Sequence, residues 1–106
     1  MPYLLVLKEP QNWERAVKRG LELIKQGETE LLVTDEAVTR CIRCEPELFR
    51  YLHQFILDGG KALVCGQSLS KYGIPETRPP EVFIRIEEGP ALISEKKKAG
   101  WQIEEF

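Results

Sequence analysis

Several features that mark common functional classes are scarce in this sequence of 106 residues. No apolar run approaches the roughly 20 residues that a membrane-spanning helix needs, so no association with a membrane is expected. The 15 Lys and Arg residues nearly balance the 17 Asp and Glu residues, so no general electrostatic attraction to nucleic acid is expected. Hydrophobic residues, in contrast, make up 42% of the chain, which is enough to form a core and excludes disorder for most of its length.

Cysteine is scarce as well. Cys41, Cys44 and Cys65 are an odd number, whereas small secreted domains held by disulfides carry more cysteines, in pairs. The first residues have no basic leader, and their apolar part is too short for a signal peptide. The sequence therefore predicts reduced thiols in a cytoplasmic protein that folds as a single domain over residues 1–106.

Short apolar runs alternate with longer segments of helical periodicity. The apolar runs predict strands at residues 3–7, 30–34, 61–65, 82–86 and 101–105. The periodic segments predict helices at residues 10–26, 46–57, 66–72 and 89–98. Residues 35–45 have no clear period and are expected to form a loop. This alternation predicts an α/β protein with three α/β/α layers around a mostly parallel five-stranded sheet.

Polar residues at the carboxyl ends of the predicted strands are the first candidates for a functional site, because ligands bind at these ends in parallel sheets. They lie at residues 8–9, 35–36, 65–68 and 87–88. Only the third group, which begins with Cys65, contains a nucleophile. We therefore expect the functional centre there, with Asp35 and Glu36 as further ligand-binding residues.

Cys65 ends a predicted strand and directly precedes a predicted helix. The first amides of a helix have no partner inside it and carry partial positive charge, so a thiol beside them ionises more easily. Gly66 allows close approach of the backbone, and Gln67 and Ser68 supply donors that suit a thiolate, a persulfide or another small anion. The alternative interpretation is that Cys65 is a small apolar residue that completes a core strand.

The segment around Cys65 also resembles a known family. Residues 64–69 (Val-Cys-Gly-Gln-Ser-Leu) and 72–74 (Tyr-Gly-Ile) are similar to the Cys-Gly-x-x-Leu and Gly-Ile motifs of the DsrE/DsrF-like family. Residues 88–93 and 99–103 resemble a later helix and the closing strand of that family, and residues 35–38 resemble an earlier turn more loosely. The motifs are short, and their shared order extends over nearly the whole chain.

This resemblance implies the three-layer fold, assembly into homotrimers or homohexamers, and sulfur relay. In such a relay a cysteine accepts sulfur as a persulfide and passes it to a partner, so sulfur donor and acceptor proteins are expected as partners. Only Cys65 matches the family's cysteine and inherits the catalytic role. No organic cofactor or metal is implied, and no hydrolase or oxidoreductase signature accompanies the resemblance. Residues 8–12 depart from the Gly-rich polar turn that many members have there.

Cys41 and Cys44 have the Cys-x-x-Cys spacing and are possible accessory thiols. The spacing is compatible with a redox pair, a zinc half-site, thiols that resolve a persulfide on Cys65, or two incidental loop thiols. A structural zinc site needs four ligands, and only Cys65 and His53 could complete the pair, so no metal site is expected. Thiol exchange requires that the loop bring the pair close to Cys65, which is a further prediction.

Two functional hypotheses of different classes follow from the sequence. In the first, the chain is a sulfur carrier that forms a persulfide on Cys65. In the second, it is a non-catalytic oligomeric binding or assembly module of the same fold, with a small-ligand cleft at the strand ends. A weaker third hypothesis is a thiol-based redox sensor that uses Cys41 and Cys44.

Overall fold

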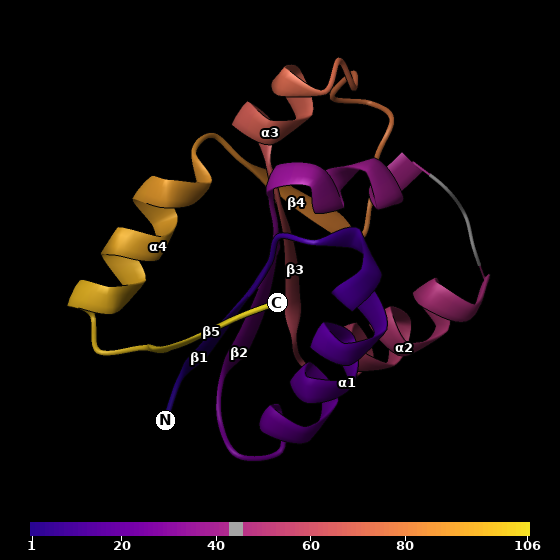
Figure 1. Ribbon diagram of the computed structural model, residues 1–106. Coiled ribbons are helices and arrows are strands. Elements are labelled where there is room, and N and C mark those ends of the chain that lie inside the picture. The colour runs from indigo at the N-terminus through magenta and orange to yellow at the C-terminus, as the bar shows by residue number, and fades with distance from the viewer. Residues whose placement is uncertain (43–45) are drawn as a thin grey trace.

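The computed structural model describes residues 1–42 and 46–106 and shows alternating strands and helices (Figure 1). The strands are β1 (Tyr3–Leu7), β2 (Thr29–Val33), β3 (Lys61–Cys65), β4 (Phe83–Ile86) and β5 (Gln102–Glu105). The α-helices are α1 (Trp13–Leu23), α2 (Pro46–Leu57), α3 (Gly66–Lys71) and α4 (Gly89–Lys98). Two 3-10 helices, η1 (Pro10–Asn12) and η2 (Asp35–Ile42), complete the elements described. Each predicted strand is therefore present, with ends that differ by at most one residue.

The five strands form one sheet in the order β4-β3-β2-β1-β5, and every neighbouring pair is parallel. Helices α1 and α2 cover one face of the sheet, and α4 lies over the other (Figure 1). The predicted three-layer α/β/α fold is thus confirmed. Within the described part of the chain, no helix has the length and apolar character needed to cross a membrane.

The larger apolar core lies between the sheet and the α1–α2 layer. Trp13 of α1, Phe49 of α2 and Phe83 of β4 meet there, with ring centroids 6.0 to 6.2 Å apart. Leu5 and Leu7 of β1 point into the same cluster and are fully buried. Such tilted and edge-on ring contacts add to the stabilisation from burial. This face is therefore the closely packed side of the molecule.

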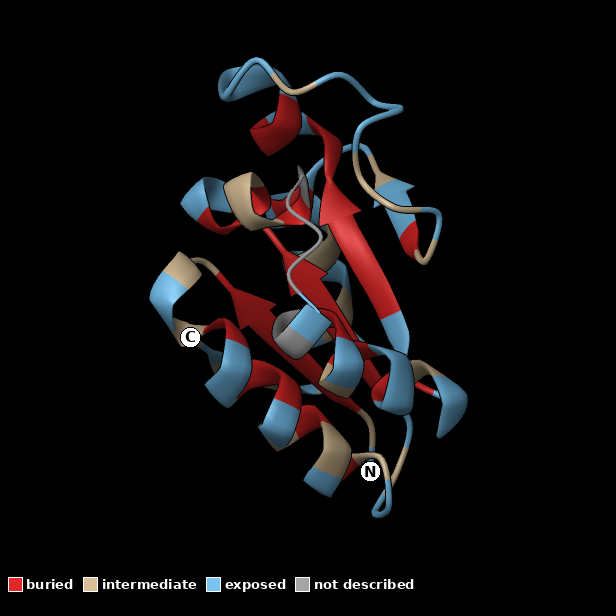
Figure 2. Cartoon of the chain, turned by 90° about the vertical axis from the view of Figure 1, so that its right-hand side faces the viewer, coloured by how far each residue is buried: buried red, intermediate tan, exposed pale blue. Residues whose placement is uncertain are grey.

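A smaller cluster lies on the opposite face, beneath α4. Its buried members come from the three central strands: Leu4, Val6, Leu32, Leu63 and Cys65. Leu92, Ile93 and Trp101 pack against it and stay partly exposed. The split between the two clusters follows from strand geometry, because successive side chains of β1 point to opposite faces. Figure 2 shows the result as buried strands between helices with exposed outer surfaces.

The prediction of a loop over residues 35–45 is wrong for residues 35–42, which form η2. Ala37, Val38 and Cys41 are fully buried in the larger cluster. Their spacing of one and three residues places them on one side of a tight helix, and burial of that side holds the segment against the core. A run this short gives too little periodicity to be recognised in the sequence. Residues 43–45 lie outside the described part of the chain.

Candidate functional site

Cys65 is the last residue of β3 and the residue directly before α3, as predicted. Its side chain points to the α4 face of the sheet and is only 1% exposed. The thiol therefore lies at the carboxyl edge of the sheet but beneath the surface. Burial of this kind fits both interpretations of Cys65, so the atoms that contact its sulfur decide its chemistry.

The sulfur of Cys65 is surrounded by hydrogen-bond donors. The backbone N–H of Gly89, the first residue of α4, donates to Cys65 Sγ at 3.2 Å. The hydroxyl and the amide of Ser68 and the hydroxyl of Thr34 also lie near the thiol and act to lower its pKa. The Thr34 and Ser68 hydroxyl oxygens are 3.1 Å apart, and Ser68 Oγ accepts a 2.8 Å hydrogen bond from the amide of Asp35. Donors from the ends of two strands and the starts of two helices thus converge on one sulfur atom.

These donors determine the direction in which the pKa of the thiol moves. Burial alone raises the pKa of Cys65, because it penalises the thiolate. Hydrogen bonds from Ser68, Thr34 and Gly89 favour the thiolate and outweigh that penalty, so the pKa is lowered from its ordinary value. The thiolate is the nucleophilic form of cysteine. The site therefore favours the reactive form of a buried thiol.

Two backbone features bring the donors into place. A Cβ atom on Gly89 would lie 3.1 Å from Thr34 Oγ1 and 3.2 Å from Cys65 Sγ, so glycine lets the start of α4 approach the sulfur closely. Asp35 has a φ of +50°, in the left-handed region that Asp tolerates better than most residues. This conformation turns the chain after β2 while the amide of Asp35 is bound to Ser68.

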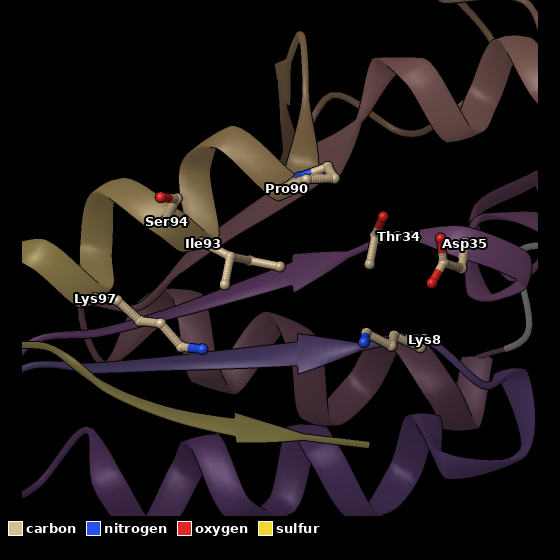
Figure 3. A pocket seen from close by; sticks show the side chains of 7 residues that line it. All are labelled: Lys8, Thr34, Asp35, Pro90, Ile93, Ser94 and Lys97. Atoms are coloured by element: carbon tan, nitrogen blue, oxygen red, sulfur yellow. The ribbon is translucent and has the colours of Figure 1, made fainter.

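A pocket of about 400 Å³, which Cys65 itself does not line, lies between α4 and the ends of β1 and β2 (Figure 3). Its lining residues are Lys8, Thr34, Asp35, Pro90, Ile93, Ser94 and Lys97. Lys97 extends from α4 at one end of the pocket, whereas Thr34 and Asp35 lie at the other end. Thr34 lines this pocket, and its Oγ1 and Cys65 Sγ lie 3.1 Å and 3.2 Å from the same point beside Gly89, so this side chain stands between the pocket and the sulfur. A pocket therefore lies at the strand ends, where the sequence predicts a small-ligand cleft.

The predicted ligand-binding residues divide into two groups. Ser68 contacts the sulfur and Asp35 lines the pocket, so these two belong to the site. Gly66 instead packs against β4, where a Cβ atom would lie 2.8 Å from Arg85 Nη2. The side chains of Gln67 and Glu36 are exposed and do not line this pocket.

Cys41 lies in a different environment from Cys65. It is fully buried in the larger cluster, on the opposite face of the sheet from Cys65. Burial raises its pKa to about 12, which keeps it a neutral thiol. The structure therefore does not bring Cys41 into the pocket beside Cys65. Cys44, the other predicted accessory thiol, lies outside the described residues.

Sequence reasoning missed Thr34, Gly89 and Lys97 as site residues. Thr34 was assigned to the second strand, yet it directly follows β2 and so occupies a strand end. Lys97 lies in a run of three lysines, residues 96–98, that is typical of a solvated helix face. Its spacing of seven and four residues from Pro90 and Ile93 places all three on one helix face, which is a pattern visible in the sequence. Across residues 1–42 and 46–106, no three His, Cys, Asp or Glu side chains gather as a metal site would require.

Comparisons with known proteins support the architecture. No family model matches the chain, and no curated protein matches it. A solved structure of MTH1491, a protein of unknown function from Methanobacterium thermoautotrophicum, has a TM-score of 0.83 at 13% identity and covers 99% of this chain and 97% of its own. The ychN protein from E. coli has a TM-score of 0.78 at 13% identity, with 100% of both chains covered.

A third similar structure is BT1422, a conserved protein of unknown function from Bacteroides thetaiotaomicron. Its TM-score is 0.76 at 12% identity, and it covers 98% of this chain and 94% of its own. At such low identity the likeness establishes a shared fold alone. All three are thus proteins with the same arrangement of strands and helices along nearly their whole length.

Proposed function

We propose that this chain is a DsrE-like sulfur carrier in which Cys65 accepts sulfur as a persulfide and passes it to a partner. The observation that supports this most is the set of donors around Cys65 Sγ, which includes the Gly89 amide at 3.2 Å. Hydrogen bonds that favour the thiolate at Sγ make Cys65 a better nucleophile when it accepts sulfur and a better leaving group when it gives sulfur away. The same donors therefore suit both halves of the transfer.

The chemistry requires no metal, no organic cofactor and no external oxidant. The Cys65 thiolate attacks the outer sulfur of a donor persulfide, R–S–SH, and a new S–S bond forms as the donor's S–S bond breaks. R–S⁻ leaves and takes a proton from solvent, and Cys65–S–SH remains. In the second half, an acceptor thiolate attacks the outer sulfur and Cys65 leaves as the thiolate. The chain and its acceptor protein are expected to be cytoplasmic, and the donor R–S–SH can be a protein or a small molecule.

Mass spectrometry after incubation with a persulfide donor tests this function. We expect a gain of one sulfur atom that maps to Cys65 and disappears in Cys65→Ser. Cys41→Ala serves as the matched control, because it removes a buried thiol from outside the site and should leave the gain intact. Sulfur that maps only to another cysteine, or no gain at all, contradicts the proposal.

The alternative is a non-catalytic oligomeric binding or assembly module with the same pocket. The 1% exposure of Cys65 favours this alternative, because a thiol that only packs needs no route to solvent. It predicts that Cys65→Ser retains ligand binding and biological activity. Under either function we expect a homotrimer or homohexamer, which light scattering measures directly.

A further inference from the structure

The charges around the pocket beside Cys65 are partly neutralised within the protein. Lys8 Nζ forms a 3.2 Å ion pair with Glu105. No described group lies within ion-pair distance of Lys97 or Asp35. One cation and one anion therefore remain unpaired in the pocket, and Figure 3 shows them at opposite ends.

A ligand that satisfies both ends carries a negative and a positive group on one small framework. The pocket volume of about 400 Å³ is near the lower limit for small-molecule sites, so it suits a molecule of amino-acid size. Pro90 and Ile93 supply apolar wall, against which the side-chain carbons of a ligand would pack. An α-amino acid carries both charges on one carbon, so the flexible side chain of Lys97 would reach in to its carboxylate while Asp35 binds its ammonium.

Thr34 gives such a ligand a chemical role. Thr34 is 4% exposed and lines the pocket, and its Oγ1 and Cys65 Sγ both lie within 3.2 Å of the position that a Cβ atom on Gly89 would take. A group on the amino-acid side chain that displaced the Thr34 hydroxyl would meet the sulfur of Cys65 directly. The Thr34 side chain has to turn aside for this contact, because Cys65 is 1% exposed and does not line the pocket.

We infer that the pocket binds a low-molecular-weight persulfide of an amino acid, of the cysteine persulfide type, as the sulfur donor of Cys65. The inference rests on the proposed function for its transfer step, whereas the binding step is independent of it. In transfer, the Cys65 thiolate attacks the outer sulfur of the bound R–S–SH. The S–S bond of the donor breaks, cysteine leaves as its thiolate and takes a proton from solvent, and Cys65 holds the persulfide.

Binding is tested with S-methylcysteine, which has the shape of cysteine persulfide but no transferable sulfur. A titration followed by NMR or calorimetry should show saturable binding to the wild type and to Cys65→Ser. We expect Asp35→Asn and Lys97→Gln each to weaken binding by roughly threefold to tenfold, as for partly exposed charge pairs. Lys98→Gln is the matched control, because Lys98 is an exposed neighbour that does not line the pocket.

Two truncated ligands assign each charge to its partner. 3-(Methylthio)propanoate lacks the ammonium group, so it should bind more weakly and be insensitive to Asp35→Asn. 2-(Methylthio)ethylamine lacks the carboxylate, so it should bind more weakly and be insensitive to Lys97→Gln. Both results together form a double-mutant cycle between protein and ligand. Equal binding of the three ligands, or no saturable binding, overturns the inference.

The rate at which different donors transfer sulfur to Cys65 distinguishes this inference from the proposed function. Cysteine persulfide should load the wild type faster than inorganic polysulfide at equal sulfur concentration, and Lys97→Gln should remove that advantage. If polysulfide loads Cys65 but S-methylcysteine does not bind, the amino-acid donor is wrong and the carrier function stands. If S-methylcysteine binds but neither donor loads Cys65, the donor role is overturned together with the carrier function.

Discussion

Cys41 and Cys65 are two buried thiols with opposite chemical character. Cys41 is 0% exposed and Cys65 is 1% exposed, so burial does not distinguish them. The pKa of Cys41 is raised to about 12 because only desolvation acts on it. The pKa of Cys65 is lowered because the donors of Ser68, Thr34 and Gly89 outweigh the same effect. The groups that face a buried sulfur, rather than its depth, therefore decide whether it can ionise.

The two thiols also differ in where their surroundings come from. Cys41 belongs to the larger cluster, whose members are apolar. Cys65 is reached by polar groups from the end of β2, the first turn of α3 and the start of α4. The carboxyl edge of a parallel sheet supplies such groups because strands end and helices begin there.

The largest expected difference between the two thiols is in alkylation of the native protein. At neutral pH, a thiol with a pKa of about 12 is ionised about a thousandfold less than one with its ordinary pKa near 9. In a Cys44→Ala background, we therefore expect iodoacetamide to modify Cys65 well before Cys41. Peptide mapping by mass spectrometry measures both rates in one sample. Comparable rates would show that the donors around Cys65 do not activate it.

Substitution of each cysteine by serine should lower the free energy of unfolding by different amounts. Cys41→Ser places a hydroxyl in an apolar cluster, where an unsatisfied polar group costs about 1 to 3 kcal/mol. Cys65→Ser places the hydroxyl among existing hydrogen-bond partners, so the loss should stay below about 1 kcal/mol. Urea unfolding of the two variants beside the wild type gives both values. Equal losses would contradict the comparison.

Removal of one donor should make Cys65 resemble Cys41 more closely. Thr34→Val keeps the shape of the side chain but loses the hydroxyl, so it should raise the pKa of Cys65 and slow its alkylation several-fold. Thr34→Ser keeps the hydroxyl and is the matched control. The pH dependence of alkylation measures the shift, and the profile of Cys41 should not change. A Cys65 profile that is the same in both variants would exclude a role for this hydroxyl.

The smallest expected effect is on the pH dependence of stability. The pKa of Cys65 is lower in the folded state than in the unfolded state, so its contribution is present above the unfolded pKa and is lost as the pH falls through the folded pKa. Cys41 behaves in the opposite way, because its contribution is present below an ordinary pKa of about 9 and is lost as the pH rises toward about 12.

Urea unfolding from about pH 7 to about pH 10 checks both signs. The stability advantage of the wild type over Cys65→Ala should grow with pH, and its advantage over Cys41→Ala should shrink at the alkaline end. Because other titrating groups are common to all three proteins, they cancel in these differences. Trends of the same sign for both variants would contradict the role of Ser68, Thr34 and Gly89 as donors to Cys65.

The fold was predictable because its pattern is local. Each strand is a short apolar run and each long helix has a clear period, and alternation of the two requires parallel crossovers. The position of Cys65 was predictable for the same reason, since an apolar run followed directly by Gly66 marks a strand end. Residues 35–42 escaped prediction because Ala37, Val38 and Cys41 are too few to show a period.

The surroundings of the thiol were only partly predictable. Ser68 was expected, because it lies three residues from Cys65 on the next element. The contact between Gly89 and Cys65 joins residues 24 positions apart and depends on how α4 packs on the sheet. Local sequence patterns carry no information on such a contact. The different surroundings of the Cys41 and Cys65 thiols likewise depend on the face of the sheet on which each side chain lies.

The pairing of β1 with β5 has a consequence for newly made molecules. It joins Tyr3 to Gln102, and α4, which carries the Gly89 amide, immediately precedes β5 in the chain. Contacts this distant in sequence form late in folding. During synthesis on a ribosome, Cys65 therefore emerges before the segment that will cover it. A nascent chain should be more vulnerable to oxidants at this position than the finished protein is.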